Sequence, residues 1–294
     1  MSTSGEALLS QYMAQVRLEV DQALASLAIY EKGCPAVLGD AIRHILLAPG
    51  KRLRPMLVLM ASDACGNRSN ATIASACAVE MIHTYSLIHD DLPAMDDDEL
   101  RRGLPTVHVV YGEANAILAG DALLAQAFEV LARSQAPASQ VVRCLQELTE
   151  AARPCQLVGG QVDDLQAENS VGNAQQLQAI HERKTGAMFR VSLRLGAIAA
   201  GANEEQIQRL DTYGKHLGLA FQIVDDLLDL QGDVAQLGKQ TGKDNEHGKL
   251  TYPALMGVTE SQEMAAGLIN QACEQLEPFG ESAEPLRQLA YFVL

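Results

Sequence analysis

The chain has 294 residues, of which 48% are hydrophobic and only 4% are aromatic, and it contains no tryptophan. Its core must therefore consist mostly of aliphatic side chains, a composition that favours helices over sheets. The formal net charge of -15 excludes a general role in nucleic-acid binding, because that role requires a basic surface.

Cysteine spacing and the N-terminal residues indicate the cellular compartment in which the protein is expected. The six cysteines form no CxxC pair and have no regular spacing, which predicts free thiols in a reducing environment. The first residues lack the basic stretch and the apolar core of a signal peptide. No uninterrupted apolar run approaches the ~20 residues that a membrane span requires. We therefore expect a cytoplasmic protein with no nucleic-acid partner and no stable membrane insertion.

Apolar residues recur at helical spacing along the chain, and the first helix that bears on function is predicted from about residue 71 to 92. Pro93 ends or bends this helix. Three aspartates, Asp90, Asp91 and Asp96, lie at its end. Their spacing does not give one clean helical face, and Pro93 provides a physical reason for a distorted backbone between them. The alternative is a solvated acidic helix end, which is our interpretation of most of the run 97–99.

A second helix is predicted from about residue 203 to 230. Its apolar seam repeats at intervals of three and four and consists of Ile207, Leu210, Gly214, Leu217, Phe221, Val224 and Leu228. Asn203 followed by Gln206 indicates a capping-box start. A polar stripe borders the seam and consists of Gln222, Asp225, Asp226 and Asp229. The aspartates of this stripe should therefore lie at the edge of the core.

Glycine and proline residues separate these helices from others, at residues 33–35, 49–50, 66–70, 103–105, 137, 201–203 and 232–233. Neither a long linker nor a change in composition interrupts the chain. Gly214 and Gly218 should let a neighbouring helix approach closely. We predict an all-α helical bundle with a single domain over residues 1–294.

Both acidic clusters offer several carboxylates, and Asp225 and Asp229 lie on one face of their helix because they are four residues apart. Like charges in this arrangement need a compensating cation. Hard carboxylate oxygens suit Mg²⁺, which completes its coordination with water and substrate phosphate oxygens. The two clusters thus predict a diphosphate that is held between them by bridging Mg²⁺.

Six blocks of sequence carry a family resemblance. They are GKRLRP at 50–55, HTYSLIHDDLPAMDDDELRRG at 83–103, HERKTG at 181–186, FQIVDDLLD at 221–229, LGK at 237–239 and GKLTYP at 248–253. In this order they resemble the motifs of short-chain (E)-prenyl diphosphate synthases, most closely those of the bacterial farnesyl diphosphate synthases. The resemblance implies an isoprenoid-synthase bundle with a central cavity, a homodimer, and condensation of isopentenyl diphosphate with dimethylallyl or geranyl diphosphate.

The resemblance assigns metal ligands and catalytic groups. The metal ligands would be Asp90, Asp91, Asp96, Asp225, Asp226 and Asp229, with three Mg²⁺ ions per substrate-bound site and Mn²⁺ as an alternative. Lys184, Thr185 and Gln222 would act with the aspartates in ionising the allylic diphosphate, although Gln222 is also open to a structural role. Gly186 marks a point where a helix could kink and turn backbone carbonyls toward a cation.

Basic residues supply the expected diphosphate sites. Lys51, Arg54 and His83 match the residues that bind isopentenyl diphosphate, and arginine suits bidentate phosphate contact. Arg102 would face the same diphosphate, and the residues that match the allylic diphosphate site are Arg101, Lys184, Lys239 and Lys249.

Several of these residues also have plainer interpretations. Taken alone, His83 is more typical of a core histidine, and Arg52 is open to an exposed position. Gly159, Gly160 and Gln161, with Asp164, resemble a further block in which Gln161 lines the pocket, but Gly-Gly is also common in turns.

Other functions share part of this pattern. A class I terpene cyclase has the fold and the first aspartate cluster, but it carries a different second metal motif and does not need the residues matched to isopentenyl diphosphate. A non-catalytic partner subunit tends to lose one aspartate cluster, whereas this chain has both. Within the synthases, the product could instead be geranyl or geranylgeranyl diphosphate.

Tyr85 lies five residues before Asp90, about 7.5 Å deeper along the predicted helix. The resemblance implies that bulk here forms the floor of the product pocket and favours a fifteen-carbon product. We predict that Tyr85→Ala lengthens the main product by at least one five-carbon unit, as measured by chromatography of the dephosphorylated products. An unchanged product profile would refute this role and leave Tyr85 as a core residue.

Overall fold

The computed structural model describes residues 3–66, 68–167, 172–231 and 250–294. Its α-helices are α1 (Thr3–Leu27), α2 (Ala36–Leu46), α3 (Leu53–Ala64), α4 (Asn70–Asp90), α5 (Val107–Tyr111), α6 (Glu113–Ala132), α7 (Ala138–Ala152), α8 (Leu157–Ala167), α9 (Ala174–His181), α10 (Ala187–Ala199), α11 (Glu204–Gln231), α14 (Tyr252–Met256), α15 (Val258–Gln275) and α16 (Glu284–Val293). A π-helical segment, η1 (Glu182–Gly186), joins α9 to α10, and a 3-10 segment, η2 (Glu277–Ala283), precedes α16. The predicted all-α fold is confirmed.

One short hairpin was not predicted. Strands β1 (Leu100–Arg101) and β2 (Leu104–Pro105) pair antiparallel, and their turn places Arg102 and Gly103 at φ values of 55° and 78°. Two-residue strands show no alternation of polar and apolar residues that a sequence pattern could reveal. The hairpin returns the chain to α4, since Arg101 binds Asp91 at the end of that helix.

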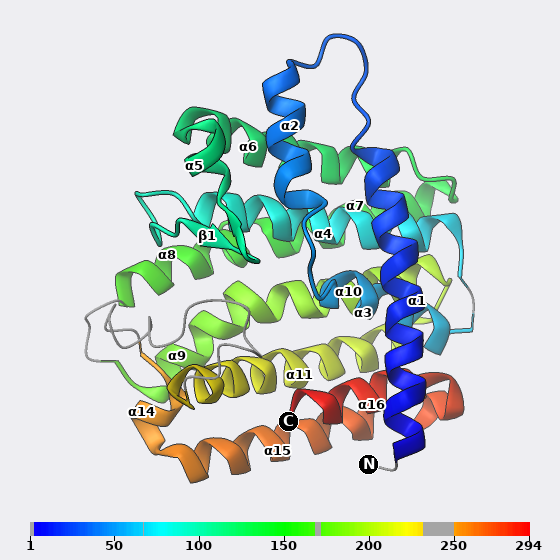
Figure 1. Cartoon of the computed structure of the whole chain (residues 1–294). Helices are drawn as coiled ribbons and strands as arrows, with labels where there is room; N and C mark the ends of the chain where they lie inside the picture. Colours follow the sequence, from blue (N-terminus) through cyan, green and yellow to red (C-terminus); the bar gives the residue numbers. More distant parts are fainter. Residues whose placement is uncertain (1–2, 67, 168–171, 232–249) are drawn as a thin grey trace.

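The core is built around α10, and Figure 1 shows α4, α10, α11 and α15 stacked one below another. Helix α10 packs against α3, α4, α7 and α11, and its Phe189, Leu193 and Leu195 side chains are fully buried. Helix α1 crosses this stack and contacts α3, α4 and α16. All six cysteines are free thiols, as predicted. The two helices that carry the aspartate clusters therefore both lie against the central helix.

Helix α11 begins where the sequence predicts. Asn203 and Gln206 exchange backbone-to-side-chain hydrogen bonds of 3.1 and 2.9 Å, which form the predicted capping box. A Cβ added to Gly214 would lie 2.7 Å from a Leu193 methyl carbon. The predicted close approach of a neighbouring helix is therefore confirmed, and that neighbour is α10.

The predicted apolar seam of α11 is correct only for its first part. Its first positions are buried, but near the C-terminal end the buried face shifts to Leu219, Ile223 and Leu227. These three residues pack with Leu177 and Tyr252 in a second, smaller apolar cluster. The seam prediction fails there because α9 and α14, rather than the main core, cover this end of the helix.

Helices α4 and α6 are both long and apolar enough to meet the length and composition criteria of a membrane span. The relevant part of α4 is 72% buried, which identifies it as a core helix. The corresponding part of α6 is only 33% buried, and Ile117 and Leu118 on this helix are exposed. Helix α6 thus leaves an apolar face uncovered in the single chain.

Gly196 permits the contact between α10 and α3. A Cβ at this position would lie 2.1 Å from the carbonyl oxygen of Val58, a backbone atom that cannot move aside cheaply. We predict that Gly196→Ala lowers the free energy of unfolding by about 2–3 kcal/mol, measured by urea denaturation. Gly267→Ala is the matched control, because a Cβ there would meet open space in α15 and should stabilise by about 0.5–1 kcal/mol. Equal stability of the two variants would contradict this account of the packing.

Candidate active site

The first aspartate cluster is compact because the chain folds back on the end of α4. The Asp96 amide donates to the Asp90 carbonyl at 2.8 Å, and the Asp98 amide donates to the Asp91 carbonyl at 3.2 Å. Asp97 takes a left-handed backbone conformation with φ of 51°. This turn brings the Asp96 backbone beside Asp90 despite their distance in sequence, in agreement with the distortion expected at Pro93.

The carboxylates of this cluster are short of positive charge. The pKa values of Asp90 and Asp91 are both raised to about 6, chiefly by burial, and for Asp90 the nearby Asp96 carboxylate contributes to this rise. Asp91 Oδ1 accepts hydrogen bonds from Arg101 Nε at 2.8 Å and Nη2 at 2.5 Å, yet Asp91 Oδ2 is buried and accepts none from the described groups. Raised pKa values and an orphaned carboxylate oxygen fit a site that gains a cation.

Helix α11 supplies the second cluster at the edge of the core, as predicted. Asp226 and Asp229 are buried, and Asp226 Oδ2 accepts a hydrogen bond of 2.9 Å from the Tyr252 amide at the start of α14. Asp225 is more accessible. Within the described ranges, no three His, Cys, Asp or Glu side chains lie close enough to hold an ion by themselves. Mg²⁺, the ion that the carboxylates predict, takes one or two carboxylates and fills its shell with water and phosphate oxygens.

Lys184 supplies a positive charge near the first cluster. Its Nζ atom is 2.6 Å from Asp164 Oδ2. Although burial lowers it, the pKa of Lys184 is raised on balance by the carboxylates of Asp164 and Asp90. Burial lowers the pKa of His181 to about 4, and the charges of both Lys184 and Asp225 act on this ring. Lys184 therefore acts on the α4 cluster, and His181 experiences the charges of both Lys184 and Asp225.

Irregular helix geometry positions Lys184 and Thr185. Both lie in the π-helical segment η1, which confirms the distortion expected near Gly186, and π-helical turns are often found at functional sites. Gly160 lies inside α8 rather than in a turn, and a Cβ there would be 2.5 Å from the Lys184 amide nitrogen. Gln161, the next residue, has both side-chain amide atoms buried without a described partner. The close packing of α8 on η1 brings Asp164 to Lys184.

Arg54, His83 and Arg102 form what we call the basic cradle. Arg54 Nη1 lies 3.3 Å from His83 Nε2, which must be the acceptor because a guanidinium can only donate. Burial lowers the pKa of His83 well below its ordinary value and that of Arg54 to about 10, so His83 is neutral at pH 7. Arg54 Nε and Arg102 Nη1 are buried and meet no acceptor among the described groups. A bound anion would accept hydrogen bonds from both of these donors.

The remaining predicted site residues differ in burial and in the groups they contact. Lys51 is exposed at the start of α3, and Gln222 is partly buried one turn before Asp225. Arg101 binds Asp91 and lies 3.1 Å from Asp98, so its guanidinium belongs to the acidic cluster here. Lys239 and Lys249 lie outside the described residues.

Tyr85 is buried on α4 between the basic cradle and the first aspartate cluster. Burial raises its pKa to about 12, and its ring meets His89 edge-on at a centroid distance of 5.8 Å. His89 Nε2 lies 3.1 Å from the Ile117 carbonyl of α6. This arrangement gives Tyr85 a rigid support across two helices.

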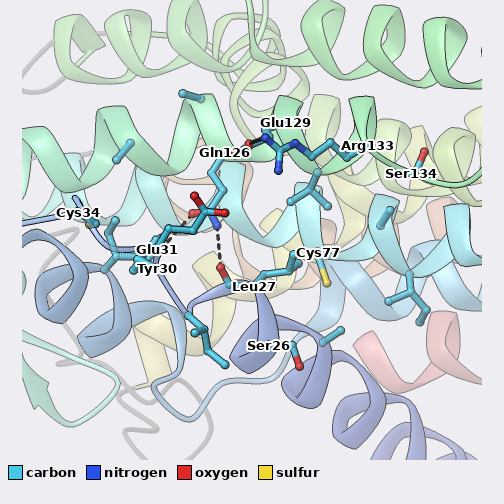
Figure 2. A pocket seen from close by; sticks show the side chains of 18 of the residues that line it. Ser26, Leu27, Tyr30, Glu31, Cys34, Cys77, Gln126, Glu129, Arg133 and Ser134 are labelled. Atoms are coloured by element: carbon cyan, nitrogen blue, oxygen red, sulfur yellow. Dashed lines mark hydrogen bonds and ion pairs between the residues drawn. The ribbon is translucent and has the colours of Figure 1, made fainter.

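A large pocket of the described chain lies elsewhere. It has a volume of about 990 Å³ and lies between α1, α2, α4 and α6. Figure 2 shows Tyr30, Gln126 and Cys77 on its walls, and Tyr30 donates a hydrogen bond of 3.1 Å to Gln126. None of the predicted site residues lines it. Pocket volume alone would therefore misplace the site.

Comparisons with known proteins agree with the motifs. Residues 35–283 match the sequence model of polyprenyl synthetases. The chain belongs to the polyprenyl synthetase family. It is similar to "Dimethylallyltranstransferase" of Fischerella ambigua (strain UTEX 1903), with 45% identity over 97% of this chain and 83% of the relative. It is also similar to "Farnesyl diphosphate synthase" of Geobacillus stearothermophilus, with 43% identity over 91% of both chains.

Other relatives of this polyprenyl synthetase family member have different product names. "Geranylgeranyl diphosphate synthase" of Cyanophora paradoxa is 45% identical over 90% of this chain and 89% of the relative. A solved "FPP/GFPP synthase" from Zymomonas mobilis superposes with a TM-score of 0.90 at 36% identity, covering 98% of this chain and all of that chain. The chain is thus a prenyltransferase of isoprenoid biosynthesis with the isoprenoid-synthase fold.

The sequence interpretation missed one group in this polyprenyl synthetase. Arg52 is buried, with 3% of its surface exposed, which rules out the exposed position that the sequence left open. Its guanidinium binds Glu80 at 2.7 Å and Asp21 at 2.8 Å. The signal was present, since Glu80 is a lone charge inside the apolar run of residues 76–82, but a pattern search for site motifs passes over it.

The raised pKa values of Asp90 and Asp91 predict how metal binding depends on pH. Mg²⁺ binds deprotonated carboxylates. Below a pH of about 6 both carboxyl groups are mostly protonated, so Mg²⁺ must displace their protons in order to bind. We expect Mg²⁺ affinity to be nearly constant from pH 7 to 8 and at least about tenfold weaker at pH 5 than at pH 7. Calorimetric titration of the folded protein with Mg²⁺ measures this, with Asp90→Asn as the control that retains a smaller dependence. Constant affinity down to pH 5 would contradict the raised pKa values.

Proposed function

We propose that the chain condenses isopentenyl diphosphate head-to-tail with dimethylallyl and geranyl diphosphate, and that farnesyl diphosphate is the main product. The observation that supports this most directly is the arrangement of charge on α4. Asp90 lies at the acidic end, and His83 of the basic cradle lies seven residues earlier, about 10 Å away along the helix. The carboxylates at the acidic end suit a diphosphate that is bound to metal ions. The arginines of the basic cradle suit a diphosphate that binds without metal.

At the acidic end, Asp90, Asp96 and Asp225 are the principal proposed metal ligands, supported by Asp91, Asp226 and Asp229. When bound, Mg²⁺ stabilises the negative charge that develops on a departing diphosphate. Three Mg²⁺ ions per substrate-bound site are proposed, with Mn²⁺ as a possible substitute. The chain itself provides Lys184, a fixed positive charge beside Asp90 and Asp164. Lys184 and Arg101, with Lys239 and Lys249, are proposed to bind the allylic diphosphate.

At the basic cradle, Arg54 and Arg102 offer their buried unpaired donors to isopentenyl diphosphate, and Lys51 adds charge from the surface. Neutral His83 orients Arg54 without competing for the anion. The allylic C–O bond breaks and releases diphosphate, the double bond of isopentenyl diphosphate attacks the allylic cation, and the resulting cation gives a proton to the released diphosphate to form the product. Gln222 and the η1 carbonyls near Thr185 are proposed to face the cation, in a site that the surrounding core shields from water.

Product length is proposed from Tyr85. Its side chain is 6% exposed and supported by His89, which is itself held against α6. A rigid aromatic ring about 7.5 Å below Asp90 would stop growth of the chain near fifteen carbons. Relatives named for farnesyl and for geranylgeranyl products occur at similar identity, so Tyr85 is the local feature that favours the shorter one.

The assembly is also a proposal. We propose a cytoplasmic homodimer in which each chain is a single domain over residues 1–294. The exposed apolar side chains of α6, such as Ile117 and Leu118, support burial of this face against a second copy. Sedimentation of the full chain should therefore give a mass near twice 31.6 kDa.

The function predicts a specific product. Purified protein with Mg²⁺, labelled isopentenyl diphosphate and geranyl diphosphate should yield mainly farnesol after dephosphorylation, and excess EDTA should abolish the reaction. Geraniol as the main product from dimethylallyl diphosphate, or geranylgeraniol from either primer, would retain the reaction but reject the role of Tyr85. A cyclic hydrocarbon would indicate a cyclase, and no product with any allylic primer would indicate a non-catalytic partner subunit.

A further inference from the structure

Glu80 is a buried carboxylate in the middle of α4 that has no role in the proposed reaction. Only 1% of its side chain is exposed. Its Oε1 atom accepts a hydrogen bond of 2.7 Å from Arg52 Nη1 and lies 3.6 Å from Arg102 Nη2. Its charge also acts on Arg54, whose pKa burial lowers and Glu80 raises. One carboxylate thus serves three arginines, two of which belong to the basic cradle.

Arg52 binds both side chains and backbone carbonyls around it. Besides Glu80, it donates to Asp21 on α1 at 2.8 Å and to the carbonyls of Leu46 and Ala48 at 2.8 and 3.0 Å. Its own backbone is left-handed, with φ of 49° and ψ of 34°, at the residue that precedes α3. Four of the five N–H donors of Arg52 are therefore engaged within the protein, and these bonds determine the path of the chain around it.

That path places the ligand-facing residues. Lys51 precedes Arg52 and Arg54 follows it by two positions, so the anchored residue orients both. Arg102 is oriented from the other side, because one end of its guanidinium faces Glu80 and the other end, Nη1, is buried without an acceptor. Gly50 lets Arg102 approach, since a Cβ there would lie 2.9 Å from the Arg102 Cζ atom.

We propose that Glu80 is the positioning residue of the isopentenyl diphosphate site, which aims Arg102 directly and Arg54 through Arg52. The inference rests on the proposed function of the basic cradle and extends it to a group that does not touch substrate. It accounts for the burial of a carboxylate beside an anion site, where its charge alone would repel the ligand.

Two interpretations of Glu80 predict opposite changes in anion affinity when its carboxylate is removed. If Glu80 only neutralises the arginines, its loss leaves more positive charge at the cradle and strengthens anion binding. If Glu80 aligns the donors, its loss weakens binding, because charge-assisted hydrogen bonds depend on geometry. Glu80→Gln keeps the side-chain shape and removes the charge, so it separates the two.

The experiment measures isopentenyl diphosphate binding to the full chain by calorimetry in EDTA, together with the KM values of both substrates. For Glu80→Gln we expect the Kd and KM for isopentenyl diphosphate to rise about 10- to 100-fold, while the KM for geranyl diphosphate stays within about twofold. Glu80→Asp retains the charge but has a shorter reach, and should weaken binding by an intermediate factor.

Asp211→Asn is the matched control. Asp211 is also buried and binds Arg190 at 2.7 and 3.0 Å and faces Arg194 at 3.7 Å, but it lies on α11 away from the cradle. This variant should lose thermal stability and retain its affinity for isopentenyl diphosphate. A loss of affinity in Asp211→Asn equal to that in Glu80→Gln would reduce the effect to general destabilisation and overturn the inference.

The remaining outcomes are distinct. A folded Glu80→Gln protein with unchanged or tighter isopentenyl diphosphate binding overturns the positioning role. If Glu80→Gln does not fold, Glu80→Asp decides, since an unchanged Kd there has the same consequence and a raised Kd supports the role. A wild-type protein that neither binds isopentenyl diphosphate nor forms product would instead overturn the proposed function, and this inference with it.

Discussion

Helix α4 buries Glu80 among three arginines and, ten residues later, two aspartates whose pKa values burial raises to about 6. A buried charge without a partner destabilises a fold by several kcal/mol, so each end of this helix needs compensation. Around Glu80 the three arginines carry more positive charge than the one carboxylate neutralises, and some of their N–H donors remain unpaired among the described groups. At the aspartates Arg101 and Lys184 provide only part of it. One end of the site therefore favours an added anion, and the other favours an added cation.

Backbone strain is concentrated at the same place. Among the described residues, the non-glycine residues with positive φ are Arg52, Asp97 and Arg102. Each left-handed residue costs about 1–2 kcal/mol and persists only where its surroundings hold it. Arg52 and Arg102 flank Glu80, and Asp97 lies in the turn that closes the aspartate cluster. The irregular segment η1 adds a further distortion at Lys184. These features lie on a regular helical core, whose close packing around α10 provides a rigid base.

Much of this could be predicted from sequence because the strongest signals are local. The capping box at Asn203 and the glycine contact at Gly214 follow from short-range geometry and are confirmed. The shift of the buried face near Ile223 was missed because it depends on a partner, Tyr252, that no local pattern identifies. The burial of Arg52 was missed for the same reason, since Glu80 lies 28 residues away in the chain. Motif spacing identifies residues that are proposed to contact substrate, but it overlooks residues such as Glu80 and Arg52 that position those residues.

The central claim is that α4 presents two diphosphate sites of opposite character. Calorimetry with isopentenyl diphosphate and with an unreactive thio analogue of geranyl diphosphate, each with Mg²⁺ and with EDTA, tests this most directly. The account predicts that isopentenyl diphosphate binds equally well without metal, whereas the geranyl analogue binds only when Mg²⁺ is present. Binding of both ligands that depends equally on Mg²⁺, or on no metal at all, would contradict it.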